Sequence, residues 1–242
     1  MVLHLLPKSM FEAIDLLPDA STPVTLFTRH SLRELVNGQG LAGYDLQLTE
    51  PGRDLAYAWG EYLSQHSDRA IQHCISSPIQ RCVDTAALMI KGADQTRSVN
   101  THRIEIVEQR LLVEPGSFVL DIQQAAPYFR KQGALGFINS FVNNALPGMK
   151  HPITGVFDVL ELLYHTHPTQ QNGLSLAVSH DTILAAIIAV ISGKTQIEQT
   201  DWPDMMEGLF VWFEGDDFAD SQLKWIWRGE KNVLNIKQFL GK

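Results

Sequence analysis

The sequence lacks the features that would place the protein in an oxidising compartment or a membrane. It contains two cysteines, Cys74 and Cys82, in 242 residues, whereas a disulfide scaffold uses more cysteines in a smaller chain. We therefore expect two buried thiols. The longest apolar run, Ile183 to Ile191, is far too short to cross a bilayer. Residues 1–8 lack the basic region and long apolar core of a secretory signal. These absences predict a soluble, cytoplasmic protein without a membrane partner.

The chain also lacks an excess of positive charge. Lysine and arginine together number 19, aspartate and glutamate 27, and the formal net charge is -8. A general nucleic-acid-binding protein needs a basic face that displaces counterions, so we expect no nucleic-acid partner. A small anionic substrate stays compatible with this balance, because a few arginines inside a cleft can outweigh the global charge.

No low-complexity stretch, internal repeat or clear linker divides the sequence. With 45% hydrophobic residues, a chain of 242 residues can bury one substantial core. One α/β domain over residues 1–242 is the simplest organisation. Within it, the segment of about 115–170 is the expected helical insertion or cap.

Strand-like and helix-like segments alternate along the chain. Such alternation is typical of βαβ units and a largely parallel sheet. Short β-branched and apolar runs predict strands at 24–28, 71–75 and 174–178, a weaker strand at 103–107, and a hairpin at 209–213 and 223–227. Helices are predicted at 49–65, 76–90, 157–165 and 183–191, with a broken helical segment at 120–145.

Three polar clusters follow predicted strands, at points where a helix is about to begin. Ligands of open α/β sheets bind at this edge, and helix N-termini there point backbone N–H groups at an anion. Arginine holds phosphate oxygens in a bidentate manner. Each cluster alone is explained as well by a surface pair or a helix cap, but together they predict a phosphate site. The clusters are Arg29-His30, Ser76-Ser77-Pro78 with Arg81, and His180-Asp181.

These segments resemble motifs of the histidine phosphatase superfamily, also called phosphoglycerate mutase-like. Residues 26–33 resemble its Arg-His-Gly signature, and residues 48–52 its Leu-Thr-x-x-Gly helix start. Residues 76–86 match its Ser-Ser-Pro-x-x-Arg-x-x-x-Thr-Ala element. Residues 178–184 resemble the second-histidine motif, in the His-Asp form of the acid phosphatase branch. The resemblance implies a three-layer α/β/α sandwich with a mostly parallel central sheet.

The sequence departs from the family pattern in three respects. Ser31 replaces the glycine after the first histidine, which narrows the backbone options. Arg33 fits the Arg-His-Gly-x-Arg form of the acid phosphatase branch, but the proline of that form is missing and the chain is short for that branch. The Trp-Asn pair of the mutase branch is also missing.

The resemblance implies a phosphomonoester hydrolase that acts through a phosphohistidine. His30 attacks phosphorus, and Arg29, Arg81 and His180, together with Arg33, bind the equatorial oxygens. A carboxylic acid protonates the leaving oxygen and later activates water. The cationic side chains perform the task that a divalent ion performs elsewhere, so the resemblance implies no metal and no cofactor. The partner is a small phosphomonoester or phosphate.

Two carboxyl groups compete for the role of the acid. Asp181 follows the second histidine, as in the acid phosphatase branch. Glu114 stands where the other branch keeps its glutamate. Because Arg33 points to the same branch as Asp181, we favour Asp181.

Two other functions stay open. The first is a catalytically inactive phosphate-binding or interaction module on the same fold; Ser31 favours it, and the intact His30, Arg81 and His180 speak against it. The second is a phosphomutase, which the first motif disfavours. The pair His165 and His167 lacks a third metal ligand nearby in the sequence, so we expect loop residues there rather than a metal site.

Overall fold

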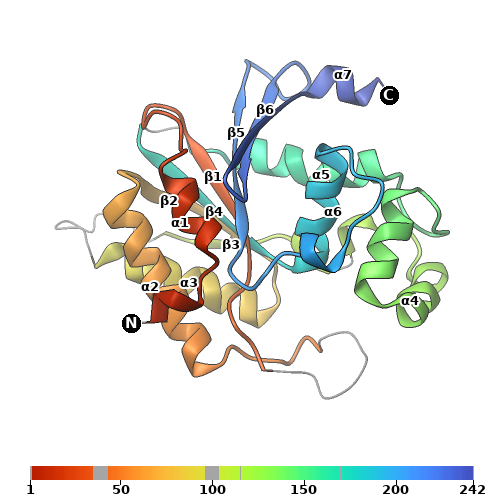
Figure 1. The fold of residues 1–242 in the computed structure, drawn as a ribbon, viewed down its shortest axis with the longest axis horizontal. Helices are drawn as coiled ribbons and strands as arrows, with labels where there is room; N and C mark the ends of the chain where they lie inside the picture. The colour runs from red at the N-terminus through yellow and green to blue at the C-terminus, as the bar shows by residue number, and fades with distance from the viewer. Residues whose placement is uncertain (1, 35–42, 96–103, 115, 169–170, 242) are drawn as a thin grey trace.

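The computed structural model describes residues 2–34, 43–95, 104–114, 116–168 and 171–241. Within these residues, one sheet of seven strands runs through the molecule in the order β3-β2-β4-β1-β5-β6-β7 (Figure 1). The strands are β1 (Val24–Arg29), β2 (Ala70–Ser76), β3 (Ile106–Glu108), β4 (Gly173–Ser179), β5 (Gly208–Glu214), β6 (Gln222–Trp227) and β7 (Glu230–Asn235).

The sheet has a parallel half and an antiparallel half. Strands β3, β2, β4 and β1 are parallel to one another. Strand β5 pairs antiparallel with β1, and β6 and β7 continue that half as a meander. The predicted parallel sheet is therefore confirmed for β1 to β4, and the predicted hairpin is β5 and β6. The third predicted strand begins at residue 103, outside the described residues, and its observed part is β3.

Helices cover both faces of the sheet, as the predicted α/β/α sandwich requires (Figure 1). One face carries α1 (Lys8–Ile14), α2 (Glu50–His66) and α3 (Gln80–Asp94), and the other carries α4 (Ile122–Val142), α5 (Pro152–His165) and α6 (Asp181–Ile191). The remaining helical elements are α7 (Ile236–Leu240) and the short 3₁₀ helices η1 (Val2–Leu5), η2 (Arg110–Leu112), η3 (Gly116–Phe118) and η4 (Gln199–Asp201). In the described part of the chain, no helix has the length and apolarity that a membrane span requires.

Each helical layer packs against its own face of the sheet, so the molecule has two apolar cores. Neighbouring residues of β1 show the division: Leu26 faces the core of α2 and α3, whereas Phe27 faces the core of α4, α5 and α6. This alternation follows from the two-residue period of a strand. Every residue of β1 is buried, which explains its unbroken apolar and β-branched sequence.

The segment predicted as an insertion or cap contains η3, α4 and α5. Helix α5 belongs to the layer on the sheet, because Phe157, Leu160 and Leu163 lie in the core of that face. Helix α4 packs on α6 and bends at Gly133, whose φ of 68° and ψ of -179° are open to glycine alone at little cost.

Candidate active site

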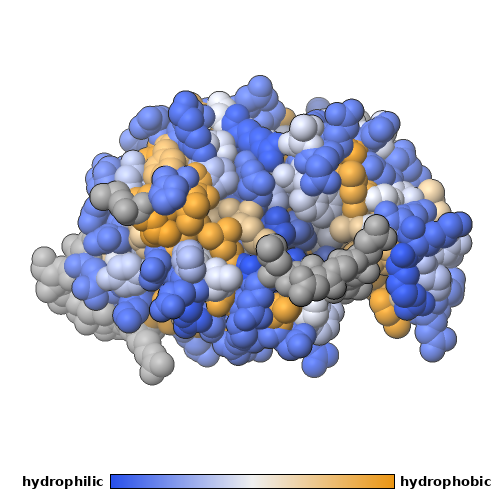
Figure 2. Space-filling view, turned by 60° about the horizontal axis from the view of Figure 1, so that its bottom comes forward, coloured by the Kyte–Doolittle hydropathy of each residue, from blue (hydrophilic) through white to orange (hydrophobic). Residues whose placement is uncertain are grey.

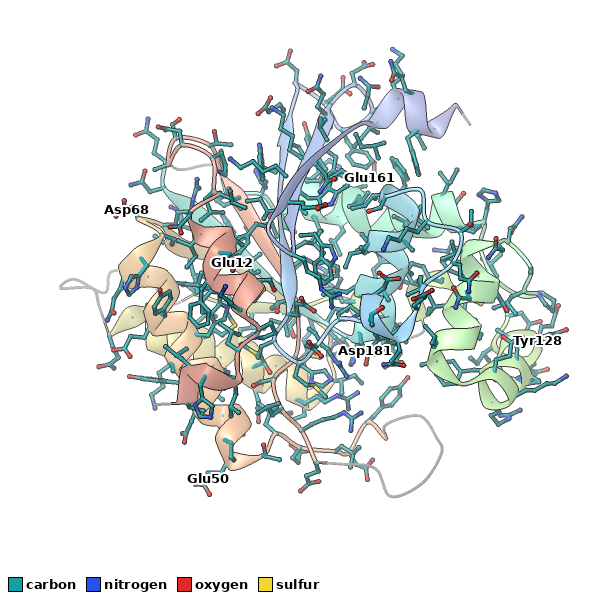
Figure 3. The ribbon with its side chains drawn as sticks, viewed as in Figure 1. Glu12, Glu50, Asp68, Tyr128, Glu161 and Asp181 are labelled. Carbon is teal, nitrogen blue, oxygen red and sulfur yellow. The ribbon has the colours of Figure 1, made fainter. Side chains whose placement is uncertain are left out.

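The three polar clusters predicted from the sequence meet at the carboxyl ends of β1, β2 and β4. Figure 3 places Asp181 at the lower end of the sheet, where α6 begins. The lower end of the molecule is turned forward in Figure 2, which shows a hollow with a mainly hydrophilic lining near its middle. Parallel strands β1, β2 and β4 are neighbours in the sheet, so side chains that follow them share one edge.

His30 follows β1 and presents one ring nitrogen to the site. Its Nδ1 lies 2.8 Å from the carbonyl oxygen of Ser31, which can only accept, so Nδ1 carries the proton. Its Nε2 accepts a hydrogen bond of 3.1 Å from Nε of Arg81. Burial, followed by the charges of His180 and Arg29, holds the pKa of His30 well below its usual value. The ring is therefore neutral, with the lone pair of Nε2 directed at the guanidinium of Arg81.

Arg81 lies at the centre of the site. It sits in the first turn of α3 and is 1% exposed. Besides His30, its guanidinium contacts Nδ1 of His180 at 3.4 Å and donates to the carbonyl of Gly43 at 3.0 Å. One turn later, the hydroxyl of Thr85 donates to the Arg81 carbonyl at 2.7 Å. The four-residue spacing of arginine and threonine in the motif thus fixes the turn that carries the arginine.

His180 stands at the N-cap of α6, directly after β4, and is fully buried. Because Nδ1 faces a donor on Arg81, Nε2 carries the proton and donates to Oγ of Ser77 at 3.0 Å. Burial and the charge of Arg81 lower the pKa of His180 to about 3. The ring centroids of His30 and His180 are 5.6 Å apart, so two neutral imidazoles flank the same guanidinium.

Arg29 and Asp181 form an ion pair at the rim of the site. Nη2 of Arg29 lies 2.5 Å from Oδ2 of Asp181. The other oxygen of that carboxylate accepts the backbone N–H of Thr182 at 2.9 Å. Both oxygens of Asp181 therefore have strong donors, while Nε of Arg29 is buried without a partner in the described residues.

A loop before β5 supports Arg29 from behind. Nη1 of Arg29 donates to the carbonyl of Pro203 at 2.7 Å, and its backbone N–H donates to the carbonyl of Glu207 at 3.0 Å. The N–H of Met206 reaches the His30 carbonyl at 3.3 Å. The carboxylate of Glu207 is buried and takes two hydrogen bonds of 2.8 Å from Arg228.

Arg33 is the most exposed of the predicted phosphate ligands. Burial lowers the pKa of Arg33, and the charges of Arg81 and Arg29 act in the same direction. Its Nη1 donates to the carbonyl of Glu34 at 2.8 Å, and its buried Nε has no partner in the described residues. Arg33 thus adds a third cation to this edge of the sheet.

Glu114 follows η2 and enters the site from the side of α6. It is 9% exposed, and its Oε2 lies 3.8 Å from Nδ1 of His180. This distance is longer than a hydrogen bond. Burial, with the charge of Asp181 acting in the same direction, raises the pKa of Glu114 to about 7. The two predicted acids therefore share the site but differ in environment.

Ser31 is compatible with the site although it replaces a glycine. Its backbone does not have a positive φ, so no glycine is needed there. Its hydroxyl points away from His30 and donates to the carbonyl of Gly52 at 2.7 Å. At Gly52 a Cβ atom would lie 2.1 Å from the Leu32 carbonyl oxygen, so α2 can begin against this segment only with glycine there. The N-cap of α2 is Thr49, whose Oγ1 accepts from the N–H of Gly52.

The structure brings together all predicted site residues and adds several that the sequence analysis missed. Ser77 was placed in one of the three polar clusters without a role of its own, and the structure shows that its hydroxyl contacts Nε2 of His180. Tyr44 donates to the Glu114 carbonyl at 2.8 Å, and no residue pattern marks it. The cysteines are buried and free, as expected, and Sγ of Cys82 lies 3.7 Å from Nε2 of His180. Outside the site, His167 contacts Thr25 from the end of α5, with Nδ1 and Oγ1 3.3 Å apart.

Residues 25–108 match the family described as the histidine phosphatase superfamily (branch 1). This match confirms the superfamily predicted from the motifs. The matched range contains His30 and Arg81 and ends before Glu114 and His180. No curated protein sequence is detectably similar to the chain.

Several solved structures share the fold. "Mycobacterial hydrolase 2" superimposes with a TM-score of 0.60 at 16% identity, over 91% of this chain and 97% of that chain. A mycobacterial glucosyl-3-phosphoglycerate phosphatase gives a TM-score of 0.57 at 16% identity, over 86% and 99%. A phosphoglycerate mutase from Bacillus anthracis str. Sterne gives 0.53 at 17% identity, over 93% and 99%. At these identities the likeness establishes the shared fold.

Proposed function

We propose that this chain, with its histidine phosphatase superfamily sequence and fold, is a phosphomonoester hydrolase that forms a phosphohistidine on His30. The observation that carries the proposal is the state of His30. Its Nδ1 proton is held by the Ser31 carbonyl, and its Nε2 lone pair faces Arg81. A neutral imidazole with one free nitrogen beside fixed cations has the state that a nucleophile toward a phosphate needs.

Arg29, Arg33, Arg81 and His180 form the phosphate clamp of this proposal. The phosphoryl group binds between these side chains and replaces contacts that they now make with other protein groups. The guanidinium of Arg81 donates from Nε to His30, from Nη2 to His180 and from Nη1 to the carbonyl of Gly43. A phosphate dianion is a stronger acceptor than an imidazole or a carbonyl, so it displaces these partners. Arg29 and Arg33 each have an Nε without a partner for the remaining oxygens.

The reaction then has two steps. Nε2 of His30 attacks phosphorus in line, the bond to the ester oxygen breaks, and a carboxylic acid gives that oxygen a proton. Water then attacks the phosphohistidine, the same carboxylate takes a proton from it, and phosphate leaves with His30 restored. The arginines neutralise the charge on the equatorial oxygens in both transition states.

The geometry favours Glu114 over Asp181 as the acid, contrary to our preference from the sequence. Burial keeps Glu114 protonated to a higher pH than an exposed glutamate, and its carboxyl lies beside the phosphate-binding His180. Asp181 accepts from Arg29 and from the N–H of Thr182, so both of its oxygens are already engaged. We therefore assign Asp181 the task of orienting Arg29.

The test is to trap the intermediate. Wild-type protein is mixed with a labelled phosphomonoester and quenched at alkaline pH, which preserves phosphohistidine. We expect labelled protein from wild type and none from His30→Ala, with phosphate release lower by several orders of magnitude in the variant. Circular dichroism checks that the variant is folded.

The same experiment separates the alternatives. An inactive phosphate-binding module would bind labelled phosphate but give no labelled protein and no release from any ester. A mutase would return the label in an isomer of its substrate rather than in free phosphate. Full activity of the folded His30→Ala variant would contradict the proposed nucleophile.

A further inference from the structure

Two adjacent residues before α2 contact both functional parts of the site. The hydroxyl of Tyr44 donates to the backbone carbonyl of Glu114 at 2.8 Å. The carbonyl of Gly43 accepts from Nη1 of Arg81 at 3.0 Å. One short segment therefore links the backbone of the acid to the arginine of the phosphate clamp.

The backbone of Glu114 depends on this contact. Upstream, the segment is tied to β4 where the Ser179 hydroxyl donates to the Leu112 carbonyl at 2.8 Å. In the described residues, the Tyr44 hydroxyl is the only hydrogen-bond partner of the Glu114 main chain. Its pKa is raised by burial and by the charge of Glu114, so the hydroxyl stays a donor.

The carboxyl of Glu114 is held only loosely by its own contacts, the hydroxyl of Thr182 among them. Its Oε2 is 3.8 Å from the ring of His180, too far for a hydrogen bond. The position of the carboxyl therefore follows the position of its backbone. Proton transfer to a leaving oxygen needs hydrogen-bond distance, so a small displacement of this backbone costs rate.

We propose that Tyr44 is a positioning residue for the carboxyl of Glu114. The inference rests on the proposed function, in which Glu114 protonates the leaving group. Tyr44 is 57% exposed and belongs to neither core, so the loss of its hydroxyl leaves both cores intact. The effect of Tyr44→Phe then reports on Glu114 rather than on the fold.

The test compares Tyr44→Phe with Tyr128→Phe, which removes the hydroxyl of an exposed tyrosine on α4 (Figure 3). The substrates are glycerol 2-phosphate, whose alkoxide needs a proton, and p-nitrophenyl phosphate, whose phenolate does not. We expect Tyr44→Phe to lower kcat/KM about 3- to 10-fold for the alkyl ester and less than about 2-fold for the aryl ester. Inhibition by inorganic phosphate should not change, and Tyr128→Phe should behave as wild type.

Four outcomes would overturn the assignment. No loss in Tyr44→Phe would show that the hydrogen bond does not position the acid. An equal loss on both esters, or weaker inhibition by phosphate, would place Tyr44 in general support of the loop or of the clamp. If wild type is active but Glu114→Gln has no leaving-group dependence, this inference fails while the hydrolase proposal stands. If wild type releases no phosphate from either ester, the proposed function itself fails, and the inference fails with it.

Discussion

At the scale of single residues, the site contains two carboxyl groups that the sequence cannot tell apart. Both lie near His180, and each has a family precedent in the motifs. Their environments separate them: Asp181 is bound by two strong donors, whereas the carboxyl of Glu114 is buried beside the ring of His180 and the hydroxyl of Thr182. Two carboxyls in unlike environments can serve as an anion and as an acid in one site.

The assignment of the acid predicts how two variants differ. Glu114→Gln should lower kcat/KM for an alkyl phosphate by roughly 10²- to 10⁴-fold and for p-nitrophenyl phosphate much less, because only the alkoxide needs a proton. Asp181→Asn should weaken both esters together, because it releases the guanidinium of Arg29. Steady-state assays of both variants on both esters measure this. A leaving-group-dependent loss in Asp181→Asn alone would restore the acid favoured by the sequence.

The raised pKa of Glu114 predicts a pH dependence of opposite sign to that of an ordinary base. The acid is active while protonated, so kcat/KM for an alkyl phosphate should fall as pH rises through about 7. His30 has a lowered pKa and stays neutral across this range, so it imposes no loss there. The ratio of alkyl to aryl ester rates cancels any ionisation of the protein that affects both esters equally. A ratio that is flat between pH 5 and 9 would contradict the assignment.

At the scale of elements, the hairpin of β6 and β7 reaches back to the site through Arg228. This residue and Gly229 form the turn, with φ values of 47° and 80°. A left-handed conformation is costly for arginine. The hydrogen bonds of its side chain explain why an arginine occupies this position. Arg228 binds the buried carboxylate of Glu207, the carbonyl of Trp202 and the carbonyl of Thr200. It thereby holds the loop on which Arg29 rests.

Removal of this tie should destabilise the protein. Arg228→Met leaves the Glu207 carboxylate buried without its counterion, which we expect to cost about 3–5 kcal/mol in the free energy of unfolding. Lys237→Met breaks an ion pair of 2.7 Å between exposed side chains, with Asp220, and serves as the control. It should be indistinguishable from wild type. Urea unfolding measures both.

A second variant separates the buried charge from the loss of packing. Glu207→Gln added to Arg228→Met removes the unpaired charge, so the double variant should recover part of the lost stability. Equal destabilisation of the single and the double variant would mean that the charge of Glu207 is not the cause.

The strands whose burial is uniform are the ones that the sequence marks most directly. Strands β1 and β4 are buried at every residue, so their apolar runs were sufficient. Strand β7 was missed, because Glu230–Asn235 is largely polar and pairs at the edge of the sheet with β6 alone. The convergence of the three clusters was predictable from parallel strands. The supports from the carbonyls of Gly43 and Pro203 were not, because every residue carries a carbonyl.

At the scale of the whole molecule, one sheet separates two cores and belongs to both. Trp59 of α2 lies in one core and Trp225 of β6 in the other. Adjacent residues of β1 contribute to opposite sides. If the residues of one core unfold, the strands lose the packing on one face, and the core on the opposite face of the same strands is destabilised as well.

This shared sheet predicts a single cooperative transition. With Trp59→Phe and Trp212→Phe combined, the remaining tryptophans report the core of α4, α5 and α6. With Trp202→Phe, Trp225→Phe and Trp227→Phe combined, the remaining tryptophans report the other core. Each unfolding curve should coincide with the curve from far-UV circular dichroism of the same variant. Transitions that separate by probe would indicate two units that unfold independently, contrary to the single domain expected from the sequence.

The order of strands in the sheet also determines when β1 can pair with its neighbours during synthesis on the ribosome. Strand β1 ends at Arg29, but its two partners begin at Gly173 and Gly208. At 5–20 residues per second, a ribosome needs roughly 10–35 s to add the intervening chain up to β5. For most of that interval, until β4 has been made, β1 has neither of its partner strands to pair with. His30, which follows β1, can meet His180 only after β4 has emerged, so the candidate site is assembled late in synthesis.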